Sequence, residues 1–236
     1  MSYIVSSHPN TLNLTQTIYK QLREDIFSIR LIPGEKLSEM KLASQYGCSR
    51  IPVREALHQL RLEGCIDSRP QIGSFISYID YENLEQVRYV RECLETQGML
   101  NALRENAYDD SIDELQSLLD QQWNAYKKKE LILAHQLDDL FHLFFLKLPH
   151  KEFVRDYMGA NNVHYQRARF LALKYDPSPE ALVWQHQAIL DAVAARDETA
   201  LTKAIHIHLN NLYRVIDSSS EEIRNYIRHH KKPVRV

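Results

Sequence analysis

The chain has 236 residues, of which 44% are hydrophobic and 25% are charged, and its formal net charge is −2. This length suits one large domain or two ordinary ones, and the apolar content is sufficient for packed cores. With 6 glycines and 8 prolines, the composition favours a mainly α-helical protein and argues against an all-β fold.

Charge is distributed unevenly between two parts of the chain. Residues 10–78 contain nine Lys/Arg and seven Asp/Glu, a net of +2, whereas residues 79–236 contain twenty and twenty-four, a net of −4. The N-terminal part is therefore the mildly basic one, as expected if nucleic acid meets one end of the protein. We expect a first domain over residues 10–78 and a second over residues 79–230.

Cysteine content and hydropathy indicate the compartment. Cys48, Cys65 and Cys93 show no metal-type spacing, and such a sparse, odd number of cysteines suits a reducing environment. No stretch approaches the roughly 18 consecutive apolar residues of a membrane span. The first residues lack the basic segment of a signal peptide. A cytoplasmic protein with no membrane partner is predicted.

The first helix is predicted from about Leu14 to Arg30, where apolar residues recur every fourth position before the turn Pro33-Gly34. A short second helix follows over Ser38–Tyr46, with Ser38 as its N-cap. Gly47 then provides the left-handed residue that ends this helix.

A third helix begins after Ser49, which is placed to cap it, and ends at Gly64. Its buried side is predicted to consist of Val53, Leu57, Leu60 and Leu62. Two short strands, over 65–69 and 74–78, come next. This order of three helices and a hairpin predicts a winged helix-turn-helix.

The remainder of the chain is predicted to be entirely helical, with no strand after Tyr78. Its helical patterns give an all-α bundle of about six helices. The predicted helices are Tyr81–Asn106, Ser111–Lys128, Glu130–Leu148, Lys151–Lys174, Ser178–Arg196 and Asp197–Arg228, the last broken near Ser218-Ser219-Ser220.

The third helix has the features of a DNA-recognition helix. Arg50 and Arg54 are four residues apart and share one face. Two guanidiniums near a helix start suit phosphate oxygens and the guanine edge in the major groove. Ser49 and the first backbone amides can hold a phosphate, and Ile51 can contact a thymine methyl.

The hairpin would form the wing, with Gln71 at its tip and Gly73 allowing the backbone to approach the minor groove. In the alternative interpretation, the two arginines of the third helix only solvate its surface and pair with Glu55 or Glu39. The helix-turn-helix-wing order favours the interpretation as a DNA-binding domain.

A family resemblance rests on several motifs: Pro33–Glu39, Leu42-Ala43, Gly47–Leu57 and Glu63-Gly64. Together they resemble the N-terminal domain of the GntR family of bacterial transcription regulators. The resemblance implies that Arg50 and Arg54 contact DNA. We also expect a homodimer, because two-fold symmetry lets paired recognition helices read a palindromic operator. The chain departs from the family at Met40 and Ile72, where many members have arginine, so the operator preference cannot be carried over.

A candidate metal site lies in the second half. Asp138 and His142 share a helix face, and His186 and His208 lie on two later predicted helices. One carboxylate and three imidazoles form a transition-metal site that leaves positions open for water or an added carboxylate. His135 and Asp139 are nearby competitors for these roles, and the chain has 11 histidines, so a hydrogen-bonded core role remains the alternative.

The segments Asp138–His142, Gln185–Val193 and His206–Leu209 resemble the FCD effector-binding domain that often follows this DNA-binding domain. The family pattern selects Asp138, His142, His186 and His208 and leaves His206 out of register. Their chemistry predicts a divalent transition metal, with zinc first and nickel or manganese as alternatives. The resemblance also implies a small organic acid effector. About six helices would place the domain in the shorter, VanR-like subgroup.

Arginines are the expected partners of such an acid. Arg91, in the sequence Arg91-x-x-Leu94-Glu95, matches a family signature on the first bundle helix, and Arg167 and Arg169 resemble the paired arginines of the fourth. We take Arg91 and Arg167 as the effector-binding candidates. An asparagine common after the third helix is absent, with His150 near that position.

These features predict a ligand-responsive transcription regulator rather than an enzyme, with repressor as the working assignment. One alternative is a helical metalloenzyme with an appended DNA-binding module, for which Glu95 is the best candidate general base. The others are a metal sensor without an organic effector and a bundle whose histidines are structural.

Overall fold

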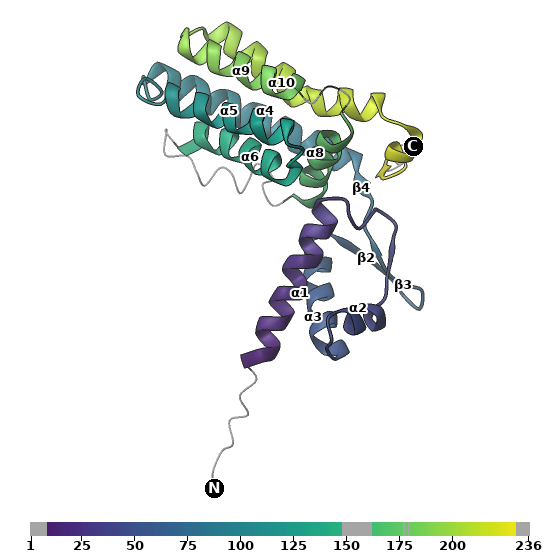
Figure 1. The fold of residues 1–236 in the computed structure, drawn as a ribbon. Helices are drawn as coiled ribbons and strands as arrows, with labels where there is room; N and C mark the ends of the chain where they lie inside the picture. The colour runs from purple at the N-terminus through teal and green to yellow at the C-terminus, as the bar shows by residue number, and fades with distance from the viewer. Residues whose placement is uncertain (1–8, 148–161, 177, 179, 230–236) are drawn as a thin grey trace. The chain divides into compact units, whose positions relative to one another are not determined.

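The computed structural model describes residues 9–147, 162–176, 178 and 180–229. The chain divides into two compact units, residues 1–79 and 80–236. The expected fold class, a winged helix-turn-helix followed by a helical bundle, is confirmed (Figure 1). Within the described residues, no helix combines the length and the apolar character needed to cross a bilayer.

The first unit combines three helices with a small antiparallel sheet of order β1-β3-β2. Strand β3 is central: its Ser74 lies opposite Ser68 of β2, and its Phe75 lies opposite Lys36 of β1. The sheet therefore ties the hairpin to the segment before the second helix. The elements are α1 (Pro9–Phe27), β1 (Lys36–Leu37), α2 (Glu39–Gln45), α3 (Arg50–Leu62), β2 (Ile66–Arg69) and β3 (Gly73–Ile76).

The ends of the first three helices follow from local chemistry. Ser38 caps α2 as predicted, its hydroxyl accepting a bond from the Lys41 amide, and Gly47 takes a φ of +60°. Helix α1 ends at Phe27, earlier than expected. There Ile29 adopts a φ of +53° and the Arg30 amide bonds to the Asp25 carbonyl, which turns the chain out of the helix.

Helices α1 and α3 pack against each other and form the core of the first unit. Ile18 and Ile26 of α1 and Val53 and Leu60 of α3 are fully buried. The prediction that Leu62 is also buried is wrong, because 75% of this residue is exposed. It follows Leu60 by two residues, which places it about 200° around the helix from the core.

The second unit is a bundle in which α10 packs on α9 and α4, and α5 packs on α6 and α9 (Figure 1). The described helices lie close to the expected ones. Residues 148–161, which include the first part of the predicted helix Lys151–Lys174 and the last residue of the predicted helix Glu130–Leu148, lie outside the described residues. The helices are α4 (Tyr81–Arg104), α5 (Ile112–Lys127), α6 (Leu131–Lys147), α8 (Val163–Tyr175), α9 (Glu180–Ala194), α10 (Glu198–Ser218) and α11 (Glu221–Arg224).

The expectation of no strand after Tyr78 is wrong. Strand β4 spans Ile79–Asp80 and strand β5 spans Ile227–Arg228. A strand of two residues is too short to show the alternation of apolar and polar side chains by which strands are recognised in a sequence.

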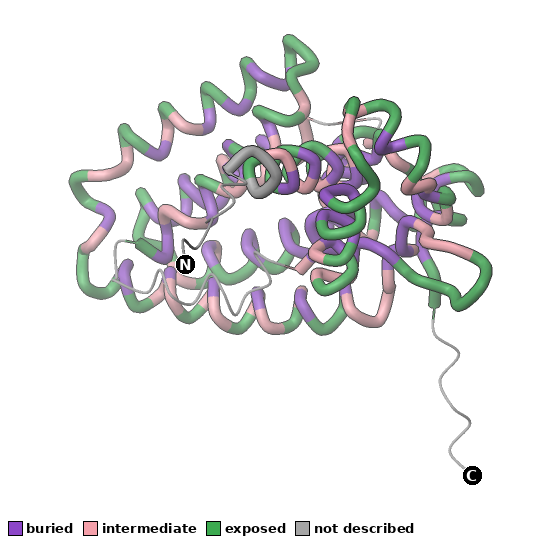
Figure 2. The backbone as a smooth tube through the Cα atoms, turned by 90° about the horizontal axis from the view of Figure 1, so that it is seen from below, coloured by how far each residue is buried: buried purple, intermediate pink, exposed green. Residues whose placement is uncertain are grey.

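Buried positions line the inner sides of the bundle helices, while their outer sides are exposed (Figure 2). Aromatic and aliphatic residues, among them Phe141, Phe145 and Ile189, make up most of this core. Several ionisable residues are nevertheless buried in the same bundle, namely Arg91, Glu95, Asp138, His142, Arg167, His186 and His208. Such groups require partners, because an unpaired buried charge is strongly destabilising.

The positions of Leu60 and Leu62 on α3 give a matched test of the fold. Leu60→Ala should lower the free energy of unfolding by about 2–5 kcal/mol, because Leu60 is wholly buried. Leu62→Ala should change it by no more than about 0.5 kcal/mol. Urea denaturation of the full chain measures both, and similar losses in the two variants would contradict the observed rotation of α3.

Candidate metal centre and nucleic-acid interface

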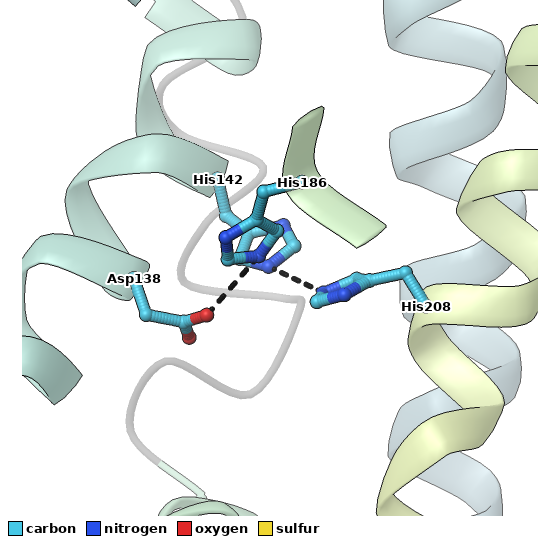
Figure 3. A group of neighbouring side chains, drawn as sticks. All are labelled: Asp138, His142, His186 and His208. Carbon is cyan, nitrogen blue, oxygen red and sulfur yellow. Dashed lines mark hydrogen bonds and ion pairs between the residues drawn. The ribbon is translucent and has the colours of Figure 1, made fainter. Parts of the chain in front are cut away.

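Four polar side chains from three helices converge inside the bundle (Figure 3). Asp138 and His142 come from α6, His186 from α9 and His208 from α10. All four are buried, and each offers a ligand atom within 4.8 Å of the others. The structure thus brings together the set that the sequence singled out.

Two of the candidate ligand atoms in this group form no hydrogen bond with the described residues. The Nε2 atoms of His142 and His208 lie 3.0 Å apart, and His186 Nε2 lies 3.2 Å from Asp138 Oδ1. Within the part of the chain that the structure describes, neither His186 Nε2 nor Asp138 Oδ1 has a hydrogen-bond partner. Leaving such buried atoms unsatisfied costs about 1–3 kcal/mol each. A divalent cation would satisfy both, so the residues fit a metal.

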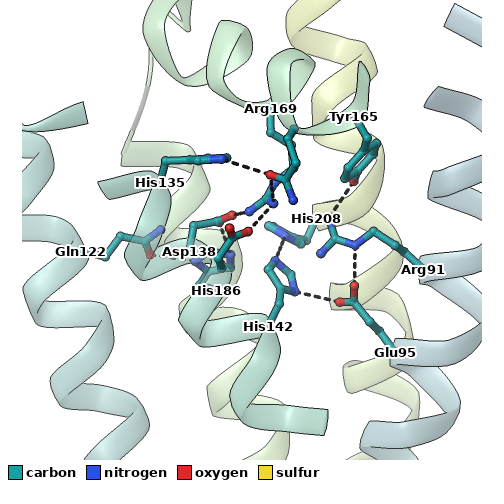
Figure 4. A network of polar contacts seen from close by, with 12 residues as sticks. Arg91, Glu95, Gln122, His135, Asp138, His142, Tyr165, Arg169, His186 and His208 are labelled. Atoms are coloured by element: carbon teal, nitrogen blue, oxygen red, sulfur yellow. Dashed lines mark hydrogen bonds and ion pairs between the residues drawn. The ribbon is translucent and has the colours of Figure 1, made fainter. Parts of the chain in front are cut away.

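Two further buried residues orient the imidazoles from outside the cluster (Figure 4). Glu95 Oε2 lies 2.8 Å from His142 Nδ1, and Gln122 Oε1 lies 2.9 Å from His186 Nδ1. A carboxylate only accepts hydrogen bonds, so the contact with Glu95 favours a proton on Nδ1 of His142 and a lone pair on Nε2. The side-chain oxygen of Gln122 favours the same tautomer of His186. This is the tautomer that binds a metal through Nε2.

The electrostatic surroundings favour the neutral form of two histidines, His186 and His208. Burial lowers the pKa of His186 and of His208 well below its usual value, and the neighbouring histidine lowers each further. Burial alone would raise the pKa of Glu95, but Arg91 and His142 hold it down to about 2. A carboxylate and neutral imidazoles are the protonation states that coordinate metals.

His135 and Asp139, the two competing candidates, occupy other positions. His135 Nε2 lies 3.1 Å from Gln166 Oε1, and burial followed by Arg169 lowers its pKa to about 3. Asp139 accepts a bond of 2.5 Å from Arg169. Neither belongs to the group of four that could hold an ion.

A cavity of about 60 Å³ adjoins the cluster. Asp138 and His208 form part of its wall, together with Arg91, Tyr165 and Arg169. About 10–15 Å³ suffices for one water molecule, so this cavity has room for several waters or a small organic molecule. A ligand in the cavity can therefore reach both the guanidiniums and the candidate metal position.

The two arginines of α8 differ in their position relative to the cavity. Arg167 is wholly buried and is not among the residues that line the cavity, whereas Arg169 is. Arg169 also forms an ion pair with Asp138, and burial, followed by the charge of Arg91, lowers the pKa of Arg169 to about 9. Arg91 lines the cavity as expected, but its Nε also bonds to Glu95.

In the first unit, Arg50 and Arg54 both pair with Glu39. Arg50 Nη2 lies 2.9 Å and Arg54 Nη2 3.1 Å from Glu39 Oε2, and both arginine side chains are more than half exposed. Glu55 instead accepts a bond from Thr15. Exposed pairs of this kind contribute about 1 kcal/mol at most, so phosphate can replace Glu39. The hydrogen bonds from Arg54 and Arg50 lower the pKa of Glu39.

The remaining DNA-contact candidates lie at the start of α3 and in the hairpin. Ser49 is the N-cap residue of α3, although its side chain makes no capping bond, and Ile51 is 63% exposed. Gln71, in the turn between β2 and β3, has a positive φ of 61°, and Gly73, the first residue of β3, has a φ of 133°. Ile72, between them, is exposed.

Two family models match the chain. Residues 14–76 match the GntR family of bacterial regulatory proteins, and residues 86–211 match the FCD domain. The two matches fall in the first and the second compact unit, respectively. The four candidate metal ligands all lie within the FCD match.

Curated relatives and solved structures agree with this result. An HTH-type transcriptional regulator of Streptomyces ambofaciens is 35% identical over 85% of this chain and 84% of its own. The transcriptional repressor RspR of Escherichia coli is 28% identical, over 90% and 92% of the two chains. Among structures, a GntR regulator of Rhodococcus has a TM-score of 0.66 at 19% identity, covering 87% and 99%.

The same fold recurs in Escherichia coli McbR/YncC, with a TM-score of 0.63 at 22% identity over 85% of this chain and 97% of that one. Structural likeness at this level of identity supports the fold, while the family matches and the 35% identical relative supply the assignment. The chain belongs to the GntR family of bacterial regulatory proteins and is a transcription regulator whose second domain is of the FCD type.

Proposed function

We propose that the protein is a homodimeric repressor that binds a palindromic operator and responds to a small organic acid held at a metal ion in its FCD domain. The observation that carries this proposal is the cavity wall, in which Asp138 and His208 lie beside Arg91 and Arg169. A wall that combines metal ligands with guanidiniums suits a carboxylate that binds both.

The exposed start of α3 supports DNA binding. Arg50 and Arg54 project from one helix face with more than half of each side chain accessible. In a helix-turn-helix, these positions meet base edges and phosphates, while Ser49 and the first amides of α3 hold a phosphate. The turn with Gln71 and Gly73 serves as the wing. Two-fold symmetry would pair two such helices on a palindromic site.

Two relatives support repression as the mode of action. RspR of Escherichia coli is named a transcriptional repressor. A protein of Paenarthrobacter nicotinovorans, 23% identical over 82% of this chain, is named a probable repressor of a D-xylose utilization operon. We extend repression, but neither relative's target, to this chain.

Zinc is the cation that best suits three imidazole nitrogens and one carboxylate oxygen, with nickel and manganese as alternatives. Asp138, His142, His186 and His208 would hold it. A cation bound there supplies a Lewis acid for an incoming carboxylate oxygen. Arg91 and Arg169 orient the acid by donating hydrogen bonds from the cavity wall.

Acid binding then regulates operator affinity through its contacts with several helices. The cavity is lined by residues of six helices, namely α4, α5, α6, α8, α9 and α10. An acid that contacts both guanidiniums would therefore influence how these helices pack. A coupling free energy of about 1–3 kcal/mol would make the response useful.

The alternative of a metalloenzyme is disfavoured by the state of its best candidate base. Glu95 is buried between Arg91 and His142, and these two partners hold its pKa at about 2. A carboxylate with so low a pKa is a poor proton acceptor at neutral pH. The remaining alternatives are a metal sensor without an organic effector and a bundle whose histidines are structural.

Replacement of Arg54 tests the DNA-binding assignment. An operator is first selected from genomic fragments with the full protein. Arg54→Ala should then weaken specific binding by about 1–3 kcal/mol if the guanidinium contacts a base. The control Arg30→Ala removes the same charge from the first unit at an exposed ion pair with Glu24 and Asp25. Equal affinities of Arg54→Ala and the wild type, measured by fluorescence anisotropy, would refute the assignment.

Metal removal tests the centre. Zinc at 100 times its Kd should stabilise the protein by about 2.7 kcal/mol, and dipicolinate should reverse this gain. His208→Ala should abolish the zinc-induced rise in Tm. His206→Ala is the matched control, because His206 is exposed and pairs with Glu92 at the surface. Loss of the zinc effect in both variants, or in neither, would contradict the proposed ligand set.

An organic effector distinguishes the proposal from a simple metal sensor. Operator binding is measured with the zinc-loaded protein across a panel of small carboxylic acids. At least one acid should change operator affinity by fivefold or more, which corresponds to about 1 kcal/mol. A response to metal alone, unaffected by every acid, would favour the metal sensor.

A further inference from the structure

We propose that Glu95 is a positioning residue of the metal centre, which fixes the ring of His142 so that its Nε2 faces the ion. This inference rests on the proposed metal site and adds to it a residue that is not itself a ligand. The sequence had suggested Glu95 only as a general base.

A continuous chain of buried contacts links the cavity wall to His142 (Figure 4). Tyr165 accepts a bond of 2.8 Å from Arg91 Nη1, and Arg91 Nε donates a bond of 2.6 Å to Glu95 Oε1. The second oxygen of Glu95 lies 2.8 Å from His142 Nδ1. Glu95 is 1% exposed, so this carboxylate is committed to two partners and shielded from water.

The consequence for His142 follows from imidazole chemistry. A carboxylate accepts a hydrogen bond from Nδ1–H and has no proton to donate, so the lone pair of the ring must lie on Nε2. Without Glu95, the opposite tautomer would be accessible. Its Nε2 would carry the proton, directed at His208 Nε2 3.0 Å away, and a protonated Nε2 has no lone pair to offer a metal ion.

The same arrangement occurs a second time with different chemistry. Gln122 Oε1 lies 2.9 Å from His186 Nδ1, and Gln122 belongs to α5 whereas Glu95 belongs to α4. Two imidazoles are thus oriented by oxygen acceptors from two different helices. His142 is backed by a charged carboxylate and His186 by a neutral amide, so Glu95 should have the larger effect on metal affinity.

Arg91 stabilises the charged form of the buried Glu95 by donating a hydrogen bond to it. An isolated carboxylate at this depth would take up a proton, whereas a bonded guanidinium stabilises its charged form. Arg91 therefore serves two parts of the site, because it also lines the cavity beside Arg169. Whatever binds Arg91 in the cavity meets a guanidinium already bonded to Glu95 and Tyr165.

Zinc affinity, measured by competition with a chromophoric chelator, tests the role of Glu95. Glu95→Gln keeps the shape and an acceptor oxygen but removes the charge, and it should weaken zinc binding by about tenfold. Glu95→Met removes the acceptor and should weaken binding by up to about 100-fold. The matched control Glu92→Gln changes a neighbouring carboxylate of α4 that pairs with Arg88 and His206, and it should leave zinc affinity unchanged.

A double variant tests whether a loss of zinc binding is caused by unfolding. Arg91→Met combined with Glu95→Met removes both buried charges together, and circular dichroism reports whether each variant is folded. The visible spectrum of the cobalt-loaded protein supplies a second readout, because a reoriented His142 should change its absorption bands. A merely structural Glu95 would leave this spectrum unchanged in folded variants.

The outcomes separate this inference from the proposed function. If the wild type binds neither zinc nor cobalt, the metal site and the inference fail together. If the wild type binds zinc but Glu95→Gln and the double variant bind it within twofold of the wild type, only the positioning role is overturned. A graded loss across Glu95→Gln and Glu95→Met, with Glu92→Gln unaffected, supports it.

Discussion

Three imidazoles and a carboxylate crowd together in the centre of a helical bundle whose core is otherwise aromatic and aliphatic. Without a shared cation, His186 Nε2 and Asp138 Oδ1 are buried without hydrogen bonds within the described residues. Burial also disfavours the charged forms of His186 and His208 and lowers the pKa of each. A shared divalent cation would give both atoms a partner, and it suits the number and chemistry of the four residues.

The surrounding helices are arranged to serve this centre. Helices α6, α9 and α10 supply the four ligands, while α4 and α5 supply the oxygens that orient two imidazoles. Helix α8 contributes Arg169, whose guanidinium pairs with Asp138 and lines the cavity. A molecule entering the cavity would thus meet groups bonded to the candidate metal ligands, so the proposed effector and the proposed metal would act on the same set of contacts.

The DNA-binding unit depends on a much weaker interaction. Glu39 forms ion pairs with Arg50 and Arg54 at the surface. Solvent screens these pairs there, and phosphate can compete with Glu39 for the two guanidiniums. An arrangement of this kind holds the two guanidiniums close together without fixing them strongly. The two sites thus differ in their surroundings. The ion pairs of Glu39, which DNA phosphates would replace, lie in water, whereas the contacts among the four candidate metal ligands lie in the core.

Local patterns in the sequence predicted much of this architecture. The four-residue spacing of Asp138 and His142 placed both on one face of α6, and the caps of α2 followed from Ser38 and Gly47. The burial of Leu62 was mispredicted because an apolar residue at the end of a helix can fall on either side of its stripe.

Long-range partners could not be predicted in the same way. Gln122 is one of several glutamines on an amphipathic helix, and only the packing of α5 against α9 brings it to His186. The choice between Arg167 and Arg169 depends on the rotation of α8, which its weakly periodic sequence does not fix. The pairing of Glu39 with two arginines depends on how α2 meets α3.

Anomalous diffraction from crystals of the zinc-loaded protein, collected on both sides of the zinc absorption edge, tests the central claim most directly. The account predicts a peak about 2.0–2.2 Å from the Nε2 atoms of His142, His186 and His208 and from Asp138 Oδ1. A zinc peak found only elsewhere, at His135 or at the exposed His206 for example, or no peak from protein saturated with zinc, would contradict it.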